Sequence, residues 1–250
     1  MMNIFKTAPR FLQLQRQLNI YNSHAPEFLA ARDSGDAEGE RELIRKYVKE
    51  FACSLVEKWK LDFEIVGKEN LPDKGPILAV SNHQSACDVL ALFYAFDKFQ
   101  MGFIAKSEWT KWKALATAIG YTRSLFITRG DKRDALKTLQ DATDLLKAGF
   151  SLTIFPEGTR SRGGEMAEFK PGSFKFAEKA KVPVLPVTVD GGWHLLEEKN
   201  SYQPCRVRIT FHPLVHYEDM TRAEQKEAQA EIYETIKSAL IPGGPDQSGL

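Results

Sequence analysis

The sequence predicts an α/β fold: a mostly parallel central sheet flanked by helices and preceded by an N-terminal amphipathic helical hairpin. The main observation is that, from Asp62 onward, short apolar runs typical of strands alternate with longer runs of helical periodicity. Such alternation is typical of parallel sheets whose crossover helices pack on both faces. The length of 250 residues suits one such domain with a sizeable core.

Composition excludes several classes of protein. Hydrophobic residues make up 43% and charged residues 27%, which fits neither a disordered chain nor a polytopic membrane protein. The net charge of +1 argues against a partner such as nucleic acid. Cys53, Cys87 and Cys205 are far apart and follow no metal-binding or disulfide spacing. We therefore expect no metal site and a reducing compartment.

Residues 1–60 are predicted to form the helical hairpin. Met1–Tyr21 contains three cations and no acid, and Thr7 and Pro9 suit a helix start. The pattern is typical of a helix lying in a membrane interface, but an ordinary helix packed on its own domain gives the same pattern. A second periodic segment follows the polar break at 33–39, so the hairpin either docks into one leaflet or caps the sheet. The first apolar stripe comprises Ile4, Phe11, Leu14, Leu18 and Tyr21.

No run of about 18 apolar residues is present, so we expect no segment that spans the bilayer. Lys6, Pro9 and Arg10 also interrupt the apolar stretch that a secretory signal needs.

Residues 61–240 are predicted to form the α/β domain, and the Gly- and Pro-rich tail 241–250 is predicted to be flexible. The predicted strands are Asp62–Val66, Pro76–Ser81, Gln100–Ala105, Leu125–Thr128, Ser151–Phe155, Val184–Val189 and Arg206–Phe211. The predicted helices of this domain are Val89–Phe96, Lys111–Ile119, Arg133–Ala148, Phe174–Ala180 and Thr221–Leu240.

His83 and Asp88 stand on a strand–loop–helix turn at the carboxyl end of a predicted strand, where ligand sites of α/β sheets gather. On a continuous helix their side chains would point about 140° apart, so they can meet only if the loop bends. Asp88 would then orient the ring, and the second ring nitrogen would accept a proton from a substrate hydroxyl. The alternatives are a helix cap at Asp88, a hydrogen-bonded loop residue at His83, or a nucleophilic Cys87.

Phe155–Arg160 is the second polar segment that follows a predicted buried strand. Pro156 ends the strand and Gly158 permits a tight turn. Arg160 beside Glu157 and hydroxyl groups suits recognition of a phosphate with neighbouring hydroxyls. A solvated turn with a local ion pair is the alternative.

Taken together, the two segments resemble the glycerolipid acyltransferase family, most of all its bacterial members that acylate 1-acylglycerol 3-phosphate. The resemblance rests on Asn82-His83-Gln84-Ser85-Ala86-Cys87-Asp88 and, about 70 residues later, Phe155-Pro156-Glu157-Gly158-Thr159-Arg160-Ser161. Phe126–Arg129 and Val182–Val187 are similar to two further family blocks, and the resemblance covers Asp62 to Phe211. The family often has an acidic residue where Thr128 stands, which leaves the acceptor headgroup open.

The resemblance implies direct transfer of a fatty acyl group from acyl-coenzyme A or acyl-carrier protein to the sn-2 hydroxyl of 1-acylglycerol 3-phosphate, giving phosphatidate without a cofactor or a covalent acyl-enzyme. His83 is the implied general base and Asp88 its partner. Lys106 is similar to a family lysine that stabilises the oxyanion, although an exposed surface lysine is the alternative. The implied acceptor-binding residues are Arg129, Glu157, Gly158, Thr159 and Arg160.

The resemblance also implies a bilayer and a lysolipid as partners, and a peripheral or monotopic position on the cytoplasmic face of the inner membrane. Three alternatives stay open: an acyltransferase on lyso-ornithine lipid or glycerol 3-phosphate, an acyl-ester hydrolase, and a non-catalytic membrane-binding module. The lack of a Gly-x-Ser-x-Gly segment argues against a hydrolase of the nucleophile-elbow type.

Overall fold

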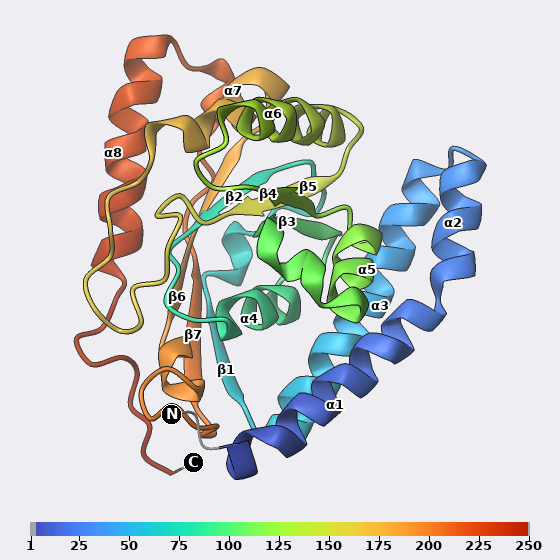
Figure 1. The fold of residues 1–250 in the computed structure, drawn as a ribbon. Helices are drawn as coiled ribbons and strands as arrows, with labels where there is room; N and C mark the ends of the chain where they lie inside the picture. Colours follow the sequence, from blue (N-terminus) through green and yellow to red (C-terminus); the bar gives the residue numbers. More distant parts are fainter. Residues whose placement is uncertain (1–3, 250) are drawn as a thin grey trace.

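The computed structural model describes residues 4–249, which contain a seven-stranded sheet in the order β1-β7-β6-β2-β5-β3-β4 (Figure 1). Neighbouring strands are parallel, except that β6 and β7 are antiparallel. This arrangement confirms the predicted mostly parallel α/β fold. The strands are β1 (Asp62–Val66), β2 (Leu78–Ser81), β3 (Met101–Lys106), β4 (Leu125–Ile127), β5 (Ser151–Ile154), β6 (Val184–Asp190) and β7 (Arg206–Phe211).

Helices cover both faces of the sheet (Figure 1). Leu92 of α4 lies in the core of one face, whereas Leu146 of α6 and Ile232 of α8 lie in the core of the other. Because side chains alternate along a strand, Ala79 of β2 belongs to the first core and Val80 to the second. The helices are α1 (Ile4–Ser23), α2 (Ala25–Asp33), α3 (Ala37–Trp59), α4 (Cys87–Ala95), α5 (Lys113–Tyr121), α6 (Lys132–Lys147), α7 (Lys175–Ala180) and α8 (Arg222–Ser238).

The N-terminal helices form a bent pair, α1 and α2, along which α3 returns toward the sheet (Figure 1). Helix α1 begins at Ile4, so Pro9 lies inside the helix and not at its start as predicted. Residues 1–3 of the predicted first helix lie outside the described residues. Leu18 and Tyr21 are buried against α3 and α5. Much of the apolar stripe of α1, which the sequence allowed as a membrane-facing surface, therefore packs on the protein itself.

Within residues 4–249, none of the helices combines the length and the apolarity that crossing a bilayer requires.

A buried carboxylate fastens the N-terminal helices to the main domain. Glu40 of α3 is 1% exposed and forms ion pairs with Arg32 of α2 and with Arg123 after α5. Arg123 donates two hydrogen bonds to it, at 2.9 and 2.7 Å. Arg32 also donates to the carbonyls of Gly120 and Tyr121. The network thus joins α2, α3 and the α5–β4 connection.

The C-terminal tail is hydrogen-bonded to the main domain, and its flexibility stays a prediction. The side-chain amide of Gln247 accepts from the backbone N–H of Arg206 at 2.8 Å and donates to the Arg206 carbonyl at 3.1 Å. The N–H of Ile241 donates to Asp190 at 2.9 Å. These contacts satisfy backbone groups of β7 and of the tail itself.

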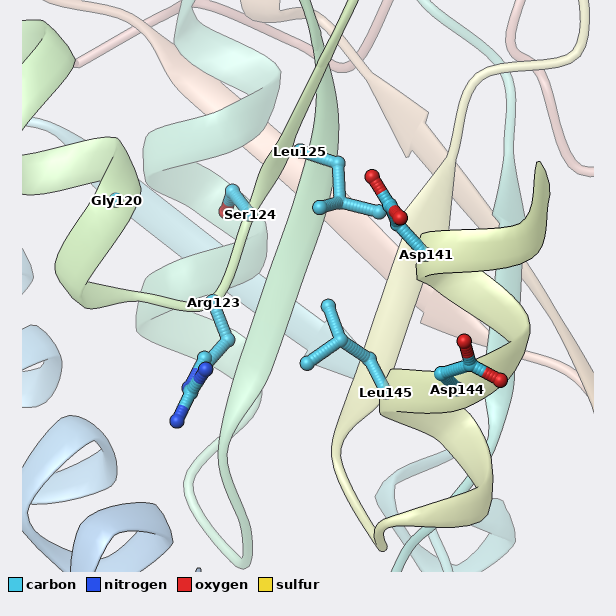
Figure 2. A pocket seen from close by; sticks show the side chains of 7 residues that line it. All are labelled: Gly120, Arg123, Ser124, Leu125, Asp141, Asp144 and Leu145. Carbon is cyan, nitrogen blue, oxygen red and sulfur yellow. The ribbon is translucent and has the colours of Figure 1, made fainter. Parts of the chain in front are cut away.

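A hollow of about 420 Å³ lies between the α5–β4 connection and α6 (Figure 2). Leu125 and Leu145 point into it, with Arg123 on one wall and Asp141 on the other. It sits at the amino end of β4, away from the strand ends that carry the predicted site residues. None of those residues lines it, so the hollow is not the candidate active site.

We expect Glu40→Gln to lower the free energy of unfolding by about 2–4 kcal/mol, because two arginines lose a buried anion. Glu42→Gln on the same helix is the matched control, since Glu42 is largely exposed in its pair with Arg45. Its effect should stay below about 1 kcal/mol. Urea unfolding of both variants measures the difference. Equal losses of unfolding free energy would contradict the proposed role of Glu40 in fastening the N-terminal helices.

Candidate active site

The predicted site residues follow four adjacent strands at one edge of the sheet. Strands β2, β5, β3 and β4 are neighbours in this order and all run parallel. Their carboxyl ends therefore lie at the same edge, where crevices of α/β sheets form. His83 follows β2, Glu157 follows β5, Lys106 ends β3 and Arg129 follows β4.

His83 and Asp88 meet, with Nδ1 2.7 Å from Oδ2. Helix α4 begins at Cys87, so Asp88 stands in its first turn and the chain bends between the two residues. The same Oδ2 atom accepts from the backbone N–H groups of Gln84 at 2.6 Å and Ser85 at 2.8 Å. Asp88 is not the helix N-cap, which is Ala86. A carboxylate only accepts, so Nδ1 donates and Nε2 is the nitrogen able to take a proton.

The imidazole of His83 is fixed from a second side by Phe155. The two rings are stacked with centroids 4.1 Å apart. The side chain of His83 is 18% exposed, and within residues 4–249 no hydrogen bond involves its Nε2. The ring is therefore oriented by Asp88 and Phe155 while one nitrogen stays open to a ligand.

Two amides anchor the loop that carries His83 to the next strand, β6. Asn82 donates to the carbonyl of Val189 and accepts from its N–H, both at 2.8 Å. Gln84 donates to Asp190 at 3.0 Å and accepts from the N–H of Gly191 at 2.9 Å. The amides thus satisfy backbone groups where the strand ladder has ended.

The loop after β2, which carries His83, and the loop after β5, which carries Arg160, are here called the two motif loops, and they are hydrogen-bonded to each other. The N–H of Ser161 donates to the carbonyl of His83 at 2.8 Å, and the N–H of Arg162 donates to that of Gln84 at 3.1 Å. Segments that lie far apart in the sequence therefore form one surface.

Glu157, predicted to bind substrate, has both carboxylate oxygens occupied by the protein. It accepts from the N–H of His83 at 2.6 Å and from the N–H of Ala167 at 2.9 Å. The side chain is buried, and burial raises the pKa of its carboxyl group. The geometry gives Glu157 a role in holding the loop of residues 82–86 that carries His83, here called the histidine loop, and its contact with the acceptor stays a prediction.

The other residues of this loop face solvent more openly. Gly158 has φ +64°, a backbone conformation that favours glycine, and Nζ of Lys170 lies beside it. Thr159 is exposed. Arg160 is half-buried, and its Nη1 donates to Glu197 at 3.0 Å. Lys170 and Arg160 thus bring two cations to one loop.

Lys106 and Arg129 form a second group around an acid. Lys106 Nζ lies 2.5 Å from Glu108, and this hydrogen bond lowers the pKa of Glu108, with Arg129 adding a smaller effect. Arg129 is exposed on the turn before α6. The ammonium of Lys106 is thus paired with Glu108, and its oxyanion role stays a prediction.

Cys87 is not a suitable nucleophile. It is buried beside Cys205, and a hydrogen bond that its thiol donates to that sulfur, together with burial, raises the pKa of Cys87 well above its ordinary value. The thiolate that attacks a substrate is therefore disfavoured.

Sequence reasoning missed Glu197, Gly192 and Lys170. Glu197 stands among other charged residues, and its contact with Ser85 joins positions 112 residues apart, so no local pattern identifies it. The paired glycines at Gly191 and Gly192, directly after a buried strand, were a usable signal of close backbone packing.

Potential metal ligands lie elsewhere in the described structure. Within residues 4–249, the one group of three such side chains comprises His216, Glu218 and Asp219, between β7 and α8.

The family model described as Acyltransferase matches residues 62–190. A 1-acyl-sn-glycerol-3-phosphate acyltransferase of Chlamydomonas reinhardtii is 40% identical over 152 residues, which are 59% of this chain and 45% of the relative. This chain therefore spans less than half the length of the algal protein. A relative of the same name from Borreliella burgdorferi is 29% identical over 192 residues and 76% of either chain.

Among solved structures, the 1-acyl-sn-glycerophosphate (LPA) acyltransferase PlsC from Thermotoga maritima superposes with a TM-score of 0.68. The alignment covers 91% of this chain and 94% of that one at 23% identity, so it supports the fold alone.

We expect one fast-reacting thiol in the native protein. Cys53 is partly exposed on α3, whereas Cys87 and Cys205 are buried. Titration with a chromogenic disulfide should release about one equivalent quickly and three after denaturation. Cys53→Ser should remove the fast phase, and a fast phase that survives it would mean that the buried pair is accessible.

Proposed function

The chain belongs to the acyltransferase family, and on this premise we propose that it transfers a fatty acyl group to the sn-2 hydroxyl of 1-acylglycerol 3-phosphate, giving phosphatidate. The donor is a thioester of coenzyme A or of acyl-carrier protein. The names of the algal and spirochaete relatives support the acceptor. The observation that carries the proposal is the 2.7 Å contact of His83 with buried Asp88, which leaves Nε2 open.

In the proposed reaction, Nε2 of His83 accepts the proton of the acceptor hydroxyl as its oxygen attacks the thioester carbonyl. Asp88 keeps the proton on Nδ1 and stabilises the imidazolium. The tetrahedral intermediate then expels the thiolate, and the imidazolium returns the proton to sulfur. One C–O bond forms and one C–S bond breaks, so no cofactor, metal or acyl-enzyme is needed.

The acceptor phosphate is proposed to bind at the Gly158–Arg160 turn. Arg160 is partly exposed there and Lys170 lies beside Gly158. Guanidinium groups match phosphate geometry, because their planar N–H donors can bind two oxygens at once. Arg129 and Lys106 stand at the same sheet edge and provide cations for the headgroup or for the developing oxyanion.

We also propose a peripheral or monotopic position on the cytoplasmic face of the inner membrane, because the acceptor is a membrane lipid. The residues that support this are Phe11, Leu12 and Trp109, here called the outer ridge; their side chains are exposed, and Phe11 stacks on Trp112, three residues after Trp109. Trp109 lies on the 3-10 turn η2 (Ser107–Lys111), which directly follows Lys106. Apolar and aromatic side chains of this kind insert into the headgroup region.

A thiol-release assay tests the reaction. With acyl-coenzyme A we expect release only when 1-acylglycerol 3-phosphate is present, and little with lyso-ornithine lipid or glycerol 3-phosphate. His83→Ala should lower kcat by about 10²–10⁴-fold, because it removes the general base. His216→Ala is the control, since that histidine is exposed outside the site.

Release without any acceptor would instead identify a hydrolase, and a folded His83→Ala variant with full activity would eliminate the mechanism.

We expect Leu12→Asp to weaken binding to anionic vesicles about tenfold or more, because an inserted leucine contributes about 1.5–3 kcal/mol. Leu136→Asp is the matched control, since Leu136 on α6 is 69% exposed and Leu12 is 67% exposed. Co-sedimentation compares the two. Point variants are preferred to deletion of α1, whose Leu18 and Tyr21 belong to the core. Equal losses of vesicle binding in both variants would argue against the outer ridge as the membrane-binding surface.

A further inference from the structure

One continuous segment, from the last two residues of β6 to Glu197, contacts the histidine loop along most of its length. Val189 and Asp190 bind the side chains of Asn82 and Gln84. The 3-10 turn η4 (Gly192–Leu195) comes next. A Cβ on Gly192 would lie only 2.6 Å from Oδ1 of Asp88, so this turn lies directly against the buried carboxylate.

Glu197 ends this segment and contacts both motif loops. Its Oε2 accepts from the hydroxyl of Ser85 at 2.9 Å, and its Oε1 accepts from the N–H of Ala86 at 3.2 Å. The same Oε1 accepts from Nη1 of Arg160 at 3.0 Å. The side chain is 8% exposed, so these three donors replace most of the water that would otherwise hydrogen-bond to the carboxylate.

We propose that Glu197 is a positioning residue that links the phosphate-binding Arg160 to the loop carrying the general base. The inference rests on the proposed acyl transfer and deepens it. By holding Nη1, Glu197 directs the remaining N–H donors of Arg160 toward the acceptor phosphate. By holding Ser85 and Ala86, it stabilises the bend that brings Asp88 to His83.

The linkage has a consequence for kinetics. Loss of Glu197 releases Arg160, so the acceptor is bound less well, while the thioester donor does not depend on this arginine. It also loosens the bend at Ser85, so the reaction step slows. A residue that only stabilised the fold would change the amount of active protein and leave both Michaelis constants unaltered.

We expect Glu197→Ala to raise KM for 1-acylglycerol 3-phosphate about five- to twentyfold, with the donor KM within about twofold, and to lower kcat. Arg160→Ala should raise the same KM. In the double variant, this KM should exceed that of the more affected single variant by no more than about twofold, because both substitutions remove the same Glu197–Arg160 interaction. Glu197→Gln keeps the shape of the side chain and one acceptor oxygen, so it should recover most of kcat. It is also the control that separates loss of the interaction from misfolding of Glu197→Ala.

Glu198→Ala is the matched control, because the neighbouring side chain points instead to His194, at 3.2 Å. Both KM values should then stay at the wild-type level. Additive effects of Glu197→Ala and Arg160→Ala, or equal rises in both KM values, would overturn the linkage alone. A wild-type protein that releases no thiol with any lysolipid would overturn the proposed function, and this inference with it.

Discussion

Oδ2 of Asp88 accepts three hydrogen bonds, and the shape of the candidate site depends on them. Two come from backbone groups of Gln84 and Ser85 and fold the loop over the start of α4. The third orients the ring of His83. Because α4 packs its apolar side chains into the core, the position of the ring is set by a helix and the sheet, and not by a mobile loop.

Three buried carboxylates share the task of holding the strand-end loops. Asp88 closes the histidine loop on itself, Glu157 after the neighbouring strand binds the N–H of His83, and Glu197 binds Ser85 on the far side of the loop. Loops have backbone donors that no ladder satisfies, and a carboxylate is the strongest neutral-pH acceptor for them. Much of the acidic charge at this site therefore serves structure, which leaves Arg160 and Lys170 to offer positive charge outward.

The strands and most helices of the main domain could be predicted, because apolar runs bounded by glycine, proline and polar residues carry this information locally. The meeting of His83 and Asp88 was also predictable, since the loop between them allows a bend. The direction in which the apolar face of α1 points could not be predicted, because a periodic apolar stripe does not reveal whether protein or lipid covers it. The backbone partners of Glu157 could not be predicted either, because their position depends on tertiary folding. Glu197 is close to the loop only in space.

The close packing of Gly192 on Asp88 limits which sequences can adopt this site. Any side chain at this position would collide with the carboxylate, so a relative that carries one must orient its histidine in another way. Together with Asp190, Gly191 and Glu197, the glycine defines a short signature, Asp-Gly-Gly followed five residues later by Glu. Such a signature would group homologues by how they support the histidine, independently of the sequence motif in which that histidine lies.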